Sequence, residues 1–461
     1  MAATSPVARA RRSTELSLVV MAALITAGAY TLASLGEFAV IPARIIPFLA
    51  VLLGLLVVAH LAVRWLAGGA DGTLLPLAAL LHGLGYVMIT RLDDRLAGLQ
   101  TTWSIVAIGA FIATLLVVQR ATDLGRYRWL LLAGGLGLLV LPLVPGVGLT
   151  VNGARIWVNL GPINFQPGEF AKIALAIFFA SYLAERRELI AESTWRVGFL
   201  RLPEPRHLLP IALAWGVAVL VMVGLNDLGS SLLFFALFVV MMWVATERTS
   251  YLALGLVMFG AAAWLSWRTV SKVQTRVDRW LDPWSDRLDT GYQVIQGLYG
   301  LSDGGIAGTG LGLGSPDTVP YAESDFIFTS IGEELGLLGG AAVLMAYLLI
   351  IGAGLRTALR TDNPFEKLLA VGLTTIVGMQ AFIIIGGVTK LVPLTGITLP
   401  FVSYGGSSLL SNYLILGLLV RLSDSGARRL HELPDDPTPS ERWAAWRLRR
   451  RRGGTDLEMS S

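Results

Sequence analysis

Carboxylates are concentrated in one short stretch, residues 319–335 (VPYAESDFIFTSIGEEL), of an otherwise strongly apolar chain. Asp325 stands at the start of an apolar segment long enough to cross a membrane, and Glu323 precedes it by two residues. Nearby acids and partial removal from water raise the pKa of a carboxyl group, which suits Asp325 to act as a general base. The alternative role is helix capping, because Asp is a favoured N-cap residue.

Glu333 and Glu334 follow Asp325 by two turns, inside the same apolar segment. A charged side chain at membrane depth costs about 3 kcal/mol unless it is paired, and capping cannot account for acids so far from the helix start. They therefore require a cation, a hydrogen-bond network or a water-filled lumen. Because Glu333 is in near register with Asp325, the segment predicts an acid-lined groove. We expect this groove, with Glu323 at its rim, to bind substrate.

A second group of charges lies in residues 152–172 (NGARIWVNLGPINFQPGEFAK), which begin as an irregular loop. Pro167 suits the first turn of a helix, so Glu169 and Lys172 share one face near the start of that helix. The chain has four lysines against 32 arginines, which makes a lysine at the head of a span unusual. The pair is either an internal ion pair or a charged site that faces a water-filled cavity.

Two further charges precede predicted spans. Asp227, in LNDLGSS, is either an outer-face acid or the cap of a helix that begins at Leu228, and its sequence context favours the cap. Lys390 lies in residues 389–408 (TKLVPLTGITLPFVSYGGSS), which are rich in Pro, Gly and hydroxyl groups. Broken backbone is tolerated at membrane depth only where it is buried in protein or lines a cavity. We therefore expect Lys390 to lie near a binding site.

Other classes of site find no support in the sequence. There is no Cys, which excludes disulfides and thiolate sites, and the four His show no metal-binding spacing. The glycine run at 308–312 follows no predicted strand, which argues against a nucleotide-binding loop. The small net charge of +4 lies at the ends and in loops, which indicates topology control and not nucleic-acid binding. No metal site or cofactor is predicted, and a divalent cation is left open.

The composition predicts an all-α polytopic membrane protein. The chain of 461 residues is 54% hydrophobic and 15% charged, whereas soluble domains carry about 25% charged residues. A spanning helix needs about 20 mostly apolar residues. By that measure there are about twelve predicted spans: 15–35, 46–66, 72–91, 101–119, 128–146, 167–186, 207–224, 230–246, 249–268, 325–354, 366–388 and 406–423.

Arginine-rich loops predict the orientation of these spans. Placing both termini in the cytoplasm puts most of the Arg inside, as the positive-inside rule requires. The expected organisation is a cytoplasmic segment 1–14 typical of an uncleaved signal anchor, a membrane domain 15–423 and a basic cytoplasmic tail 424–461. Outer loops are then expected at 147–166 and 269–324.

The longer outer loop contains an amphipathic pattern. Its apolar residues recur at helical spacing with charged residues between them, and Pro283 must bend or interrupt the helix. Such a helix lies either on the outer membrane face or against the protein's own spans. The apolar residues are Val277, Trp280, Leu281, Trp284 and Leu288, and the charged ones are Arg276, Asp278, Arg279 and Asp286.

These segments resemble the signature motifs of the SEDS (shape, elongation, division and sporulation) family, which comprises the RodA and FtsW proteins. The matching motifs are, in order, residues 152–172, NDLGSS, GYQVIQGLYGLSDGG, ESDFIFTSIGEELG and LTGITLPFVSYGGSS. The resemblance covers roughly residues 72–423 and implies a ten-span core, to which this chain adds two N-terminal spans. It implies a peptidoglycan glycosyltransferase that polymerises lipid II on the outer face of the cytoplasmic membrane. Undecaprenyl pyrophosphate would be the leaving group, and a class B penicillin-binding protein would be the partner.

The resemblance also implies roles for individual residues. Asp325 matches the acid of the family's DFIF motif, which is regarded as essential for polymerisation. Glu169 and Lys172 match the Glu and Lys at the head of that span, Asp227 matches the acid of the DLG motif, and Arg155 matches the Arg of the NGAR motif. Because cations stabilise the charge that develops on a leaving pyrophosphate, we expect Arg155 and Lys172 to bind it.

The chain departs from the family pattern at three places. Glu323 stands where many members have His, and residues 385–387 read Ile-Gly-Gly where Asn-Val-Gly is common. The two N-terminal spans are the third departure. Together these features resemble the RodA-type elongation branch of actinobacterial members, which acts in cell shape.

Two other functions fit a membrane protein of this kind. A polyprenyl-lipid flippase should carry gating charges along its whole depth, whereas the ionisable residues here cluster in the outer half. A non-catalytic scaffold of the cell-wall machinery would have no need of acids buried at Glu333 and Glu334. Glycosyl transfer at the outer surface is therefore the preferred interpretation.

Overall fold

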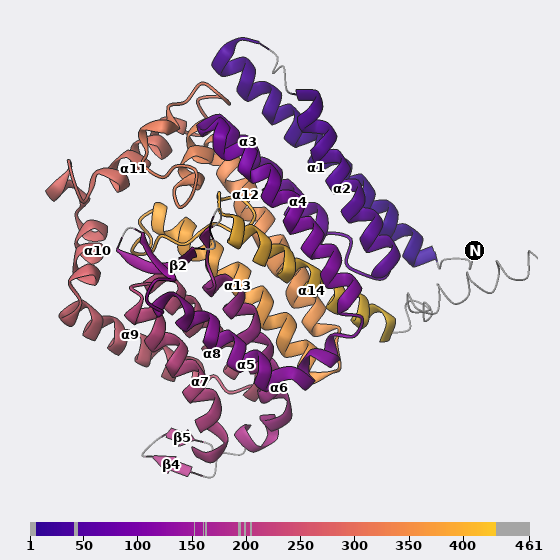
Figure 1. Cartoon of the computed structure of the whole chain (residues 1–461), viewed down its shortest axis with the longest axis vertical. Helices are drawn as coiled ribbons and strands as arrows, with labels where there is room; N and C mark the ends of the chain where they lie inside the picture. The colour runs from indigo at the N-terminus through magenta and orange to yellow at the C-terminus, as the bar shows by residue number, and fades with distance from the viewer. Residues whose placement is uncertain are drawn as a thin grey trace, which may run out of the picture.

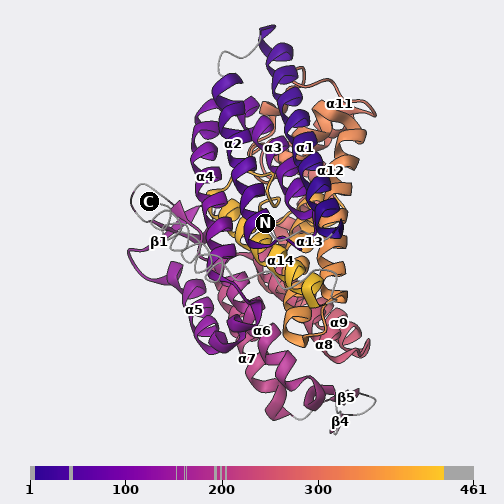
Figure 2. The same cartoon turned by 90° about the vertical axis from the view of Figure 1, so that its right-hand side faces the viewer.

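The computed structural model describes residues 6–40, 45–151, 153–159, 161, 164–191, 195–197, 200–202 and 205–429. Its long helices run roughly parallel and form one bundle (Figures 1 and 2). The bounds of these long helices are α1 Pro6–Phe38, α2 Ile45–Leu66, α3 Leu74–Leu92, α4 Asp94–Val117, α5 Arg128–Val140, α6 Gly168–Ala191, α7 Pro205–Gly224, α8 Leu228–Thr246, α9 Ser250–Thr269, α12 Ile327–Leu359, α13 Pro364–Val388 and α14 Gly406–Arg429.

Shorter elements lie between these helices. Two are α-helices, α10 Ser271–Leu281 and α11 Tyr292–Gly304, and four are 3-10 turns, η1 Ala121–Tyr127, η2 Leu141–Leu143, η3 Pro283–Asp286 and η4 Pro316–Thr318. One antiparallel sheet has the order β1 Gly148–Val151, β2 Ala154–Asn159 and β3 Asn164–Phe165, and a second pairs β4 Trp195–Val197 with β5 Leu200–Leu202.

Each of the twelve predicted spans coincides with a long helix, and the polytopic helical class is confirmed. Nine helical segments of the described residues are long and apolar enough to cross a membrane, and shorter apolar stretches lie in α2 and α7. The remaining long helix, α6, carries charged residues at both ends, Glu169 and Lys172 at its start and residues 185–188 near its end, so the count of twelve stays a prediction there. The helix α1 already begins at Pro6, inside the expected polar segment 1–14. Most of the expected tail, from residue 430 on, lies outside the described residues.

The prediction of an irregular loop within residues 147–166 is wrong, because this segment contains the first sheet. Its strand β2 pairs with β1 through Leu149 and Trp157, and with β3 through Val158 and Phe165. The sequence ARIWVN alternates β-branched and aromatic residues, which favour strands, and Gly153 makes the β1–β2 turn at a positive φ of 73°. Gly153 and Gly161 therefore lie between short strands, and Pro167 precedes α6.

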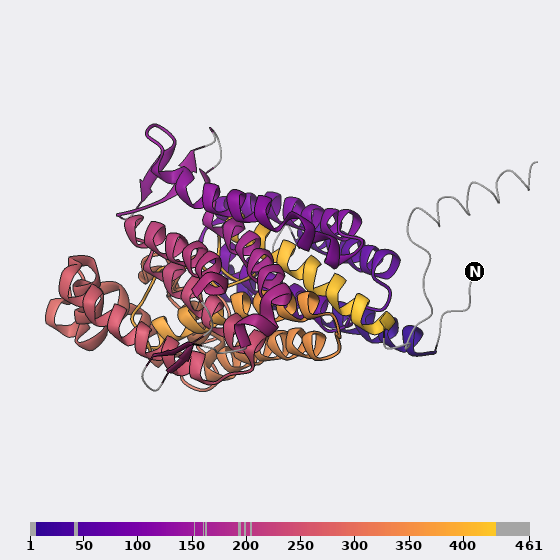
Figure 3. The same cartoon turned by 90° about the horizontal axis from the view of Figure 1, so that it is seen from below.

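The amphipathic helix predicted within residues 269–324 is confirmed as α10. It ends before Pro283, which opens η3, and Asp282 caps that turn by accepting a hydrogen bond from the Trp284 backbone N–H. The helix is half-buried and contacts α9 and η3, which supports packing against the protein itself. Exposed Leu281, Trp284 and Leu288 remain at its C-terminal end. The helices α10 and α11 and the sheet strand β2 lie at the same end of the bundle (Figures 1 and 3).

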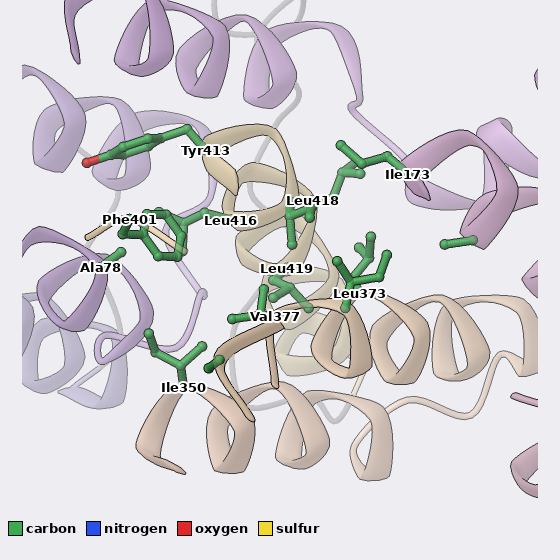
Figure 4. Packing of buried hydrophobic residues seen from close by; sticks show 14 of the residues in the cluster. Ala78, Ile173, Ile350, Leu373, Val377, Phe401, Tyr413, Leu416, Leu418 and Leu419 are labelled. Atoms are coloured by element: carbon green, nitrogen blue, oxygen red, sulfur yellow. The ribbon is translucent and has the colours of Figure 1, made fainter. Parts of the chain in front are cut away.

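The helix α14 occupies the centre of the bundle. It contacts α3, α4, α6, α12 and α13, and its apolar side chains interdigitate with those of its neighbours (Figure 4). Leu419 is buried beside Leu373 and Val377 of α13, and Leu416 is buried beside Phe401 of the segment that precedes α14. Because α14 follows directly on residues 389–405, this packing holds the preceding irregular segment against the bundle.

The helix α12 is broken at Gly336, where φ is 67° and ψ is −169°. The glycine-rich segment 305–315 lies against this break, and the backbone N–H groups of Leu337 and Leu338 donate to the carbonyls of Gly305 and Ile306. A Cβ at position 336 would lie 2.3 Å from the Gly308 backbone nitrogen. The break is therefore tolerated because protein backbone satisfies the polar groups that it frees.

We expect Gly336→Ala to lower the thermal stability of the purified protein. A left-handed conformation costs a residue with a side chain about 1–2 kcal/mol, and the steric overlap with Gly308 adds to this. The matched control is Gly352→Ala in the same helix, where a Cβ would meet no atom within 4 Å and stability should be unchanged or slightly raised. Equal unfolding temperatures of the two variants in detergent would contradict this account.

Candidate active site

Asp325 lies in the turn that leads into α12. It does not cap the helix, because α12 begins after Phe326 without a side-chain capping bond. The Ser324 hydroxyl donates to Asp325 Oδ1 at 3.0 Å. Burial raises the Asp325 pKa to about 6, with a smaller upward contribution from Glu323, while Ser324 and Arg276 act in the opposite direction. A carboxyl group with this pKa is ionised at neutral pH and still basic enough to accept a proton.

The segment 389–405 holds Asp325 in place. The Tyr404 backbone N–H donates to the Glu323 carbonyl at 2.9 Å, and the Ser403 hydroxyl donates to the Ser324 carbonyl. A Cβ at Gly396, whose φ is 76°, would lie 3.7 Å from Asp325 Oδ2. Residues 389–405 thus lie beside the carboxylate, and whether they line a binding site stays a prediction.

Asp227 caps α8, as its sequence context favoured. Its Oδ1 accepts a hydrogen bond from the Ser230 backbone N–H at 3.0 Å. Burial raises the Asp227 pKa, and the hydrogen bonds from Ser230 and the charge of Arg276 oppose the rise. Glu169 adds to the rise, so Asp227 lies within electrostatic reach of both Arg276 and Glu169. Asp227 and Asp325 therefore both interact with the same guanidinium group, that of Arg276.

Glu169 and Lys172 form an internal ion pair, one of the two arrangements that the sequence allowed. Lys172 Nζ lies 2.6 Å from Glu169 Oε2 and donates to Gln380 Oε1 at 2.9 Å. The Ser411 hydroxyl donates to the same Glu169 oxygen at 2.7 Å. Lys172 is only 1% exposed. The pair therefore joins α6 to α13 and α14, and whether it also contacts substrate stays a prediction.

Glu333 and Glu334 bind the backbone of the glycine-rich segment. Glu333 Oε1 accepts from the Ser315 N–H at 2.6 Å, and Glu334 Oε2 accepts from the Gly312 N–H at 3.0 Å. Arg91 of α3 lies 3.3 Å from Glu334 and 3.2 Å from Glu37 of α1. These contacts account for the burial of both glutamates, and they supply the hydrogen-bond network that the sequence required. A role in substrate binding stays a prediction.

Lys390 and Arg155 also have contacts within the protein. Lys390 Nζ lies 5.7 Å from the centre of the Trp284 ring, and the Lys390 carbonyl accepts from Trp280 Nε1 at 2.9 Å. Arg155, on β2, donates from Nη2 to the Val144 carbonyl at 3.2 Å. Lys390 therefore attaches the end of α10 to the segment 389–405, next to Asp325.

Three basic residues near this site were not singled out as site residues from the sequence. They are Lys272, Arg276 and Arg279, all on α10. Arg276 and Arg279 entered the sequence analysis only as the polar side of an amphipathic helix. The signal that would have identified them is the spacing of four and three residues, which places all three on one helical face. Among the described residues, no group of three or more His, Asp or Glu side chains is arranged to hold a metal ion.

The fold and this site define a polytopic membrane protein with an acidic site at one end of its helical bundle. A family model described as "Cell cycle protein", covering FtsW, RodA and SpoVE, matches residues 72–427. The chain belongs to this FtsW/RodA/SpoVE family, as the sequence motifs predicted.

Curated relatives cover nearly the whole chain. The peptidoglycan glycosyltransferase RodA of Mycobacterium tuberculosis is 42% identical over 448 residues, which are 95% of this chain and 96% of the relative. The protein of the same name from Mycobacterium leprae is 41% identical over 439 residues, covering 93% and 94% of the two chains. These matches include the two N-terminal helices that lie outside the family model.

Solved structures show the same fold. A chain from a structure described as "Structural coordination of polymerization and crosslinking by a peptidoglycan synthase complex" aligns with a TM-score of 0.64 at 28% identity, covering 77% of this chain and 98% of the other. The rod shape determining protein RodA of Thermus thermophilus aligns with a TM-score of 0.56 at 26% identity, covering 78% and 98%.

We expect Lys172→Met to destabilise the protein. Removing one partner of a buried ion pair leaves the other charge uncompensated, at a cost of about 3–5 kcal/mol. Adding Glu169→Gln to Lys172→Met should recover much of the loss, which thermal unfolding of the single and double variants in detergent would measure. If Lys172→Met is as stable as the parent but loses activity per folded molecule, the pair is not structural and Lys172 acts on substrate.

Proposed function

We propose that this protein polymerises lipid II into glycan strands, with Asp325 as the general base. Its class as a peptidoglycan glycosyltransferase follows from family membership and from 42% identity to RodA relatives over 95% of the chain. The observation that carries the proposal for Asp325 is its position: a carboxylate beside the irregular segment 389–405, with a pKa raised to about 6 by burial.

The proposed reaction joins two lipid II molecules. The 4-hydroxyl of the acceptor's terminal GlcNAc attacks the anomeric carbon of the donor and gives its proton to the Asp325 carboxylate. The new bond joins this oxygen to the anomeric carbon, while the bond from that carbon to the phosphate oxygen breaks. Undecaprenyl pyrophosphate leaves with the electron pair. Because the lipid tails stay in the bilayer, the sugars must react at its edge, where Asp325 precedes its span.

The proposal includes the protein's orientation and partner. The protein would lie in the cytoplasmic membrane with both termini in the cytoplasm. The end of the bundle that carries the site would then face away from the cytoplasm, because the positive-inside rule places the arginine-rich loops on the cytoplasmic side. A class B penicillin-binding protein would crosslink the strands, and co-purification from membranes tests this. The relative that aligns with a TM-score of 0.64 comes from a peptidoglycan synthase complex that coordinates polymerisation with crosslinking, which supports such a partner.

A flippase or a scaffold is less well supported. Several buried ionisable groups of the bundle, including Glu169, Lys172 and Glu334, already have partners within the protein, as a static charge network requires. The acids that lie nearest to segment 389–405 are at one end of the bundle, not along its depth. These observations favour chemistry at one membrane face.

We expect Asp325→Asn to reduce polymerisation of purified lipid II by about 10²–10⁴-fold, the usual contribution of a positioned base. The substitution preserves shape, so thermal stability and assembly with the partner should be unchanged. Labelled lipid II and gel analysis of the polymer measure the effect. Near-normal polymer from Asp325→Ala protein that still assembles with its partner would remove Asp325 from the mechanism.

The pH dependence of the reaction follows from the raised pKa of Asp325. The base acts in its ionised form, so the rate should fall about tenfold per pH unit below about pH 6 and level off above it. Glu323 raises this pKa, so Glu323→Gln should move the profile to lower pH. Arg276 lowers it, so loss of Arg276 should move the profile to higher pH. A profile that is identical in Glu323→Gln would show that Glu323 is not coupled to the base.

A further inference from the structure

One face of α10 carries three cations. Lys272, Arg276 and Arg279 are separated by four and three residues, which places them on the same side of the helix. The exposed apolar residues Leu281, Trp284 and Leu288 lie at and beyond its C-terminal end. Asp278 is exposed to solvent, whereas the three cations are all half-buried. The basic face of α10, meaning these three residues, is turned toward the protein at Lys272 Nζ, Arg276 Nη1 and Arg279 Nε, which are shielded from solvent.

The basic face of α10 is directed at the site of Asp325. The charges of Asp227 and Asp325 both act on Arg276, and Asp227 acts on Lys272. A Cβ at Gly153, in the β1–β2 turn, would lie 3.7 Å from Lys272 Nζ. Trp280, on the same helix, donates to the Lys390 carbonyl in the segment that borders Asp325. The basic face thus lies beside the β1–β2 turn and within electrostatic reach of the acids that precede α8 and α12.

Each of these three cations has a buried nitrogen without a hydrogen-bond partner in the described part of the chain. Lys272 Nζ, Arg276 Nη1 and Arg279 Nε are shielded from solvent, yet none makes a hydrogen bond within the described part of the chain. Burial lowers the pKa of Arg276, and the charge of Arg279 lowers it further. Buried donors and neighbouring like charges are unfavourable unless an anion binds them. Elsewhere in the site, by contrast, the buried cation Lys172 has two partners.

We propose that the basic face of α10 binds the pyrophosphate of the donor lipid and stabilises the charge that develops on it as it leaves. This inference rests on the proposed function, since it names how that site holds its leaving group. From the sequence alone this role fell to Arg155 and Lys172, but Lys172 donates to Glu169 and Gln380 within the protein. The three cations have donors without partners, and their positive charge is complementary to a pyrophosphate. The negative charge of the pyrophosphate rises as the glycosyl bond breaks. The guanidinium group of arginine can donate hydrogen bonds to two phosphate oxygens at once.

The test uses the full-length protein with its partner and two readouts. The first is the affinity for undecaprenyl pyrophosphate in detergent without phospholipid, with undecaprenyl monophosphate for comparison. The second is the kcat of lipid II polymerisation. Arg276→Gln should lower kcat by about 10²–10³-fold, as loss of one transition-state donor does, and should weaken binding of the pyrophosphate more than of the monophosphate. Arg276→Lys keeps the charge but cannot make the bidentate contact, so its kcat and its affinity for the pyrophosphate should lie between those of the parent and of Arg276→Gln.

The matched control is Arg287→Gln, which removes one exposed positive charge from the same loop outside α10. If Arg276→Gln and Lys272→Gln behave like Arg287→Gln in both readouts, the proposal is overturned. It is also overturned if their defects appear only in vesicles with anionic phospholipid, because the face then binds lipid headgroups. Should Arg276→Gln fail to fold, Lys272→Gln and Arg276→Lys decide the matter.

Failure of the inference is distinguishable from failure of the proposed function. If polymer formation depends on Asp325 but not on the basic face of α10, the proposed function is supported and the inference about the basic face is contradicted. Absence of polymer from the parent protein would contradict the proposed function, while the binding measurement would still report whether α10 takes a pyrophosphate.

Discussion

A polar group removed from water inside a helical bundle requires a partner, and this requirement shapes the fold around the site. Glu169 and Lys172 pair with each other and with side chains of α13 and α14, so one buried charge pair joins three helices. The break in α12 at Gly336 frees backbone groups, and the glycine-rich segment satisfies them. The positions of α6, α12, α13 and α14 therefore depend on paired polar groups as well as on apolar packing.

The same requirement connects the N-terminal helices to the active site. Arg91 of α3 lies between Glu37 of α1 and Glu334 of α12, and Glu334 also holds the Gly312 backbone. Helix α1, which precedes the region matched by the family model, is thereby linked through Arg91 of α3 to the helix that follows Asp325. The relatives from Mycobacterium align over this N-terminal region as well. Helix α1 is thus part of the structure that holds the start of α12.

The basic face of α10 departs from this requirement, as do other buried polar atoms of the described residues, such as Arg155 Nε and Thr395 Oγ1. Its buried donors remain without partners, while Asp227 and Asp325 lie close enough to act on Arg276. A site that is incomplete without its ligand differs from a structural network in this respect, because substrate supplies the missing partner. The same arrangement places the proposed base and a set of cations at one end of the bundle, as the proposed transfer of a sugar from a pyrophosphate requires.

The sequence by itself determined the class of protein and the position of its long helices and singled out Asp325 as a candidate base, because apolar run length and local motifs are properties of consecutive residues. It also predicted α10, whose apolar residues recur at helical spacing. Only the tertiary structure decided which groups on different elements meet: Lys172 donates to Gln380, Glu334 pairs with Arg91, and Arg276 lies within electrostatic reach of Asp325. Pairing depends on distances between helices far apart in the chain, and no local spacing encodes them.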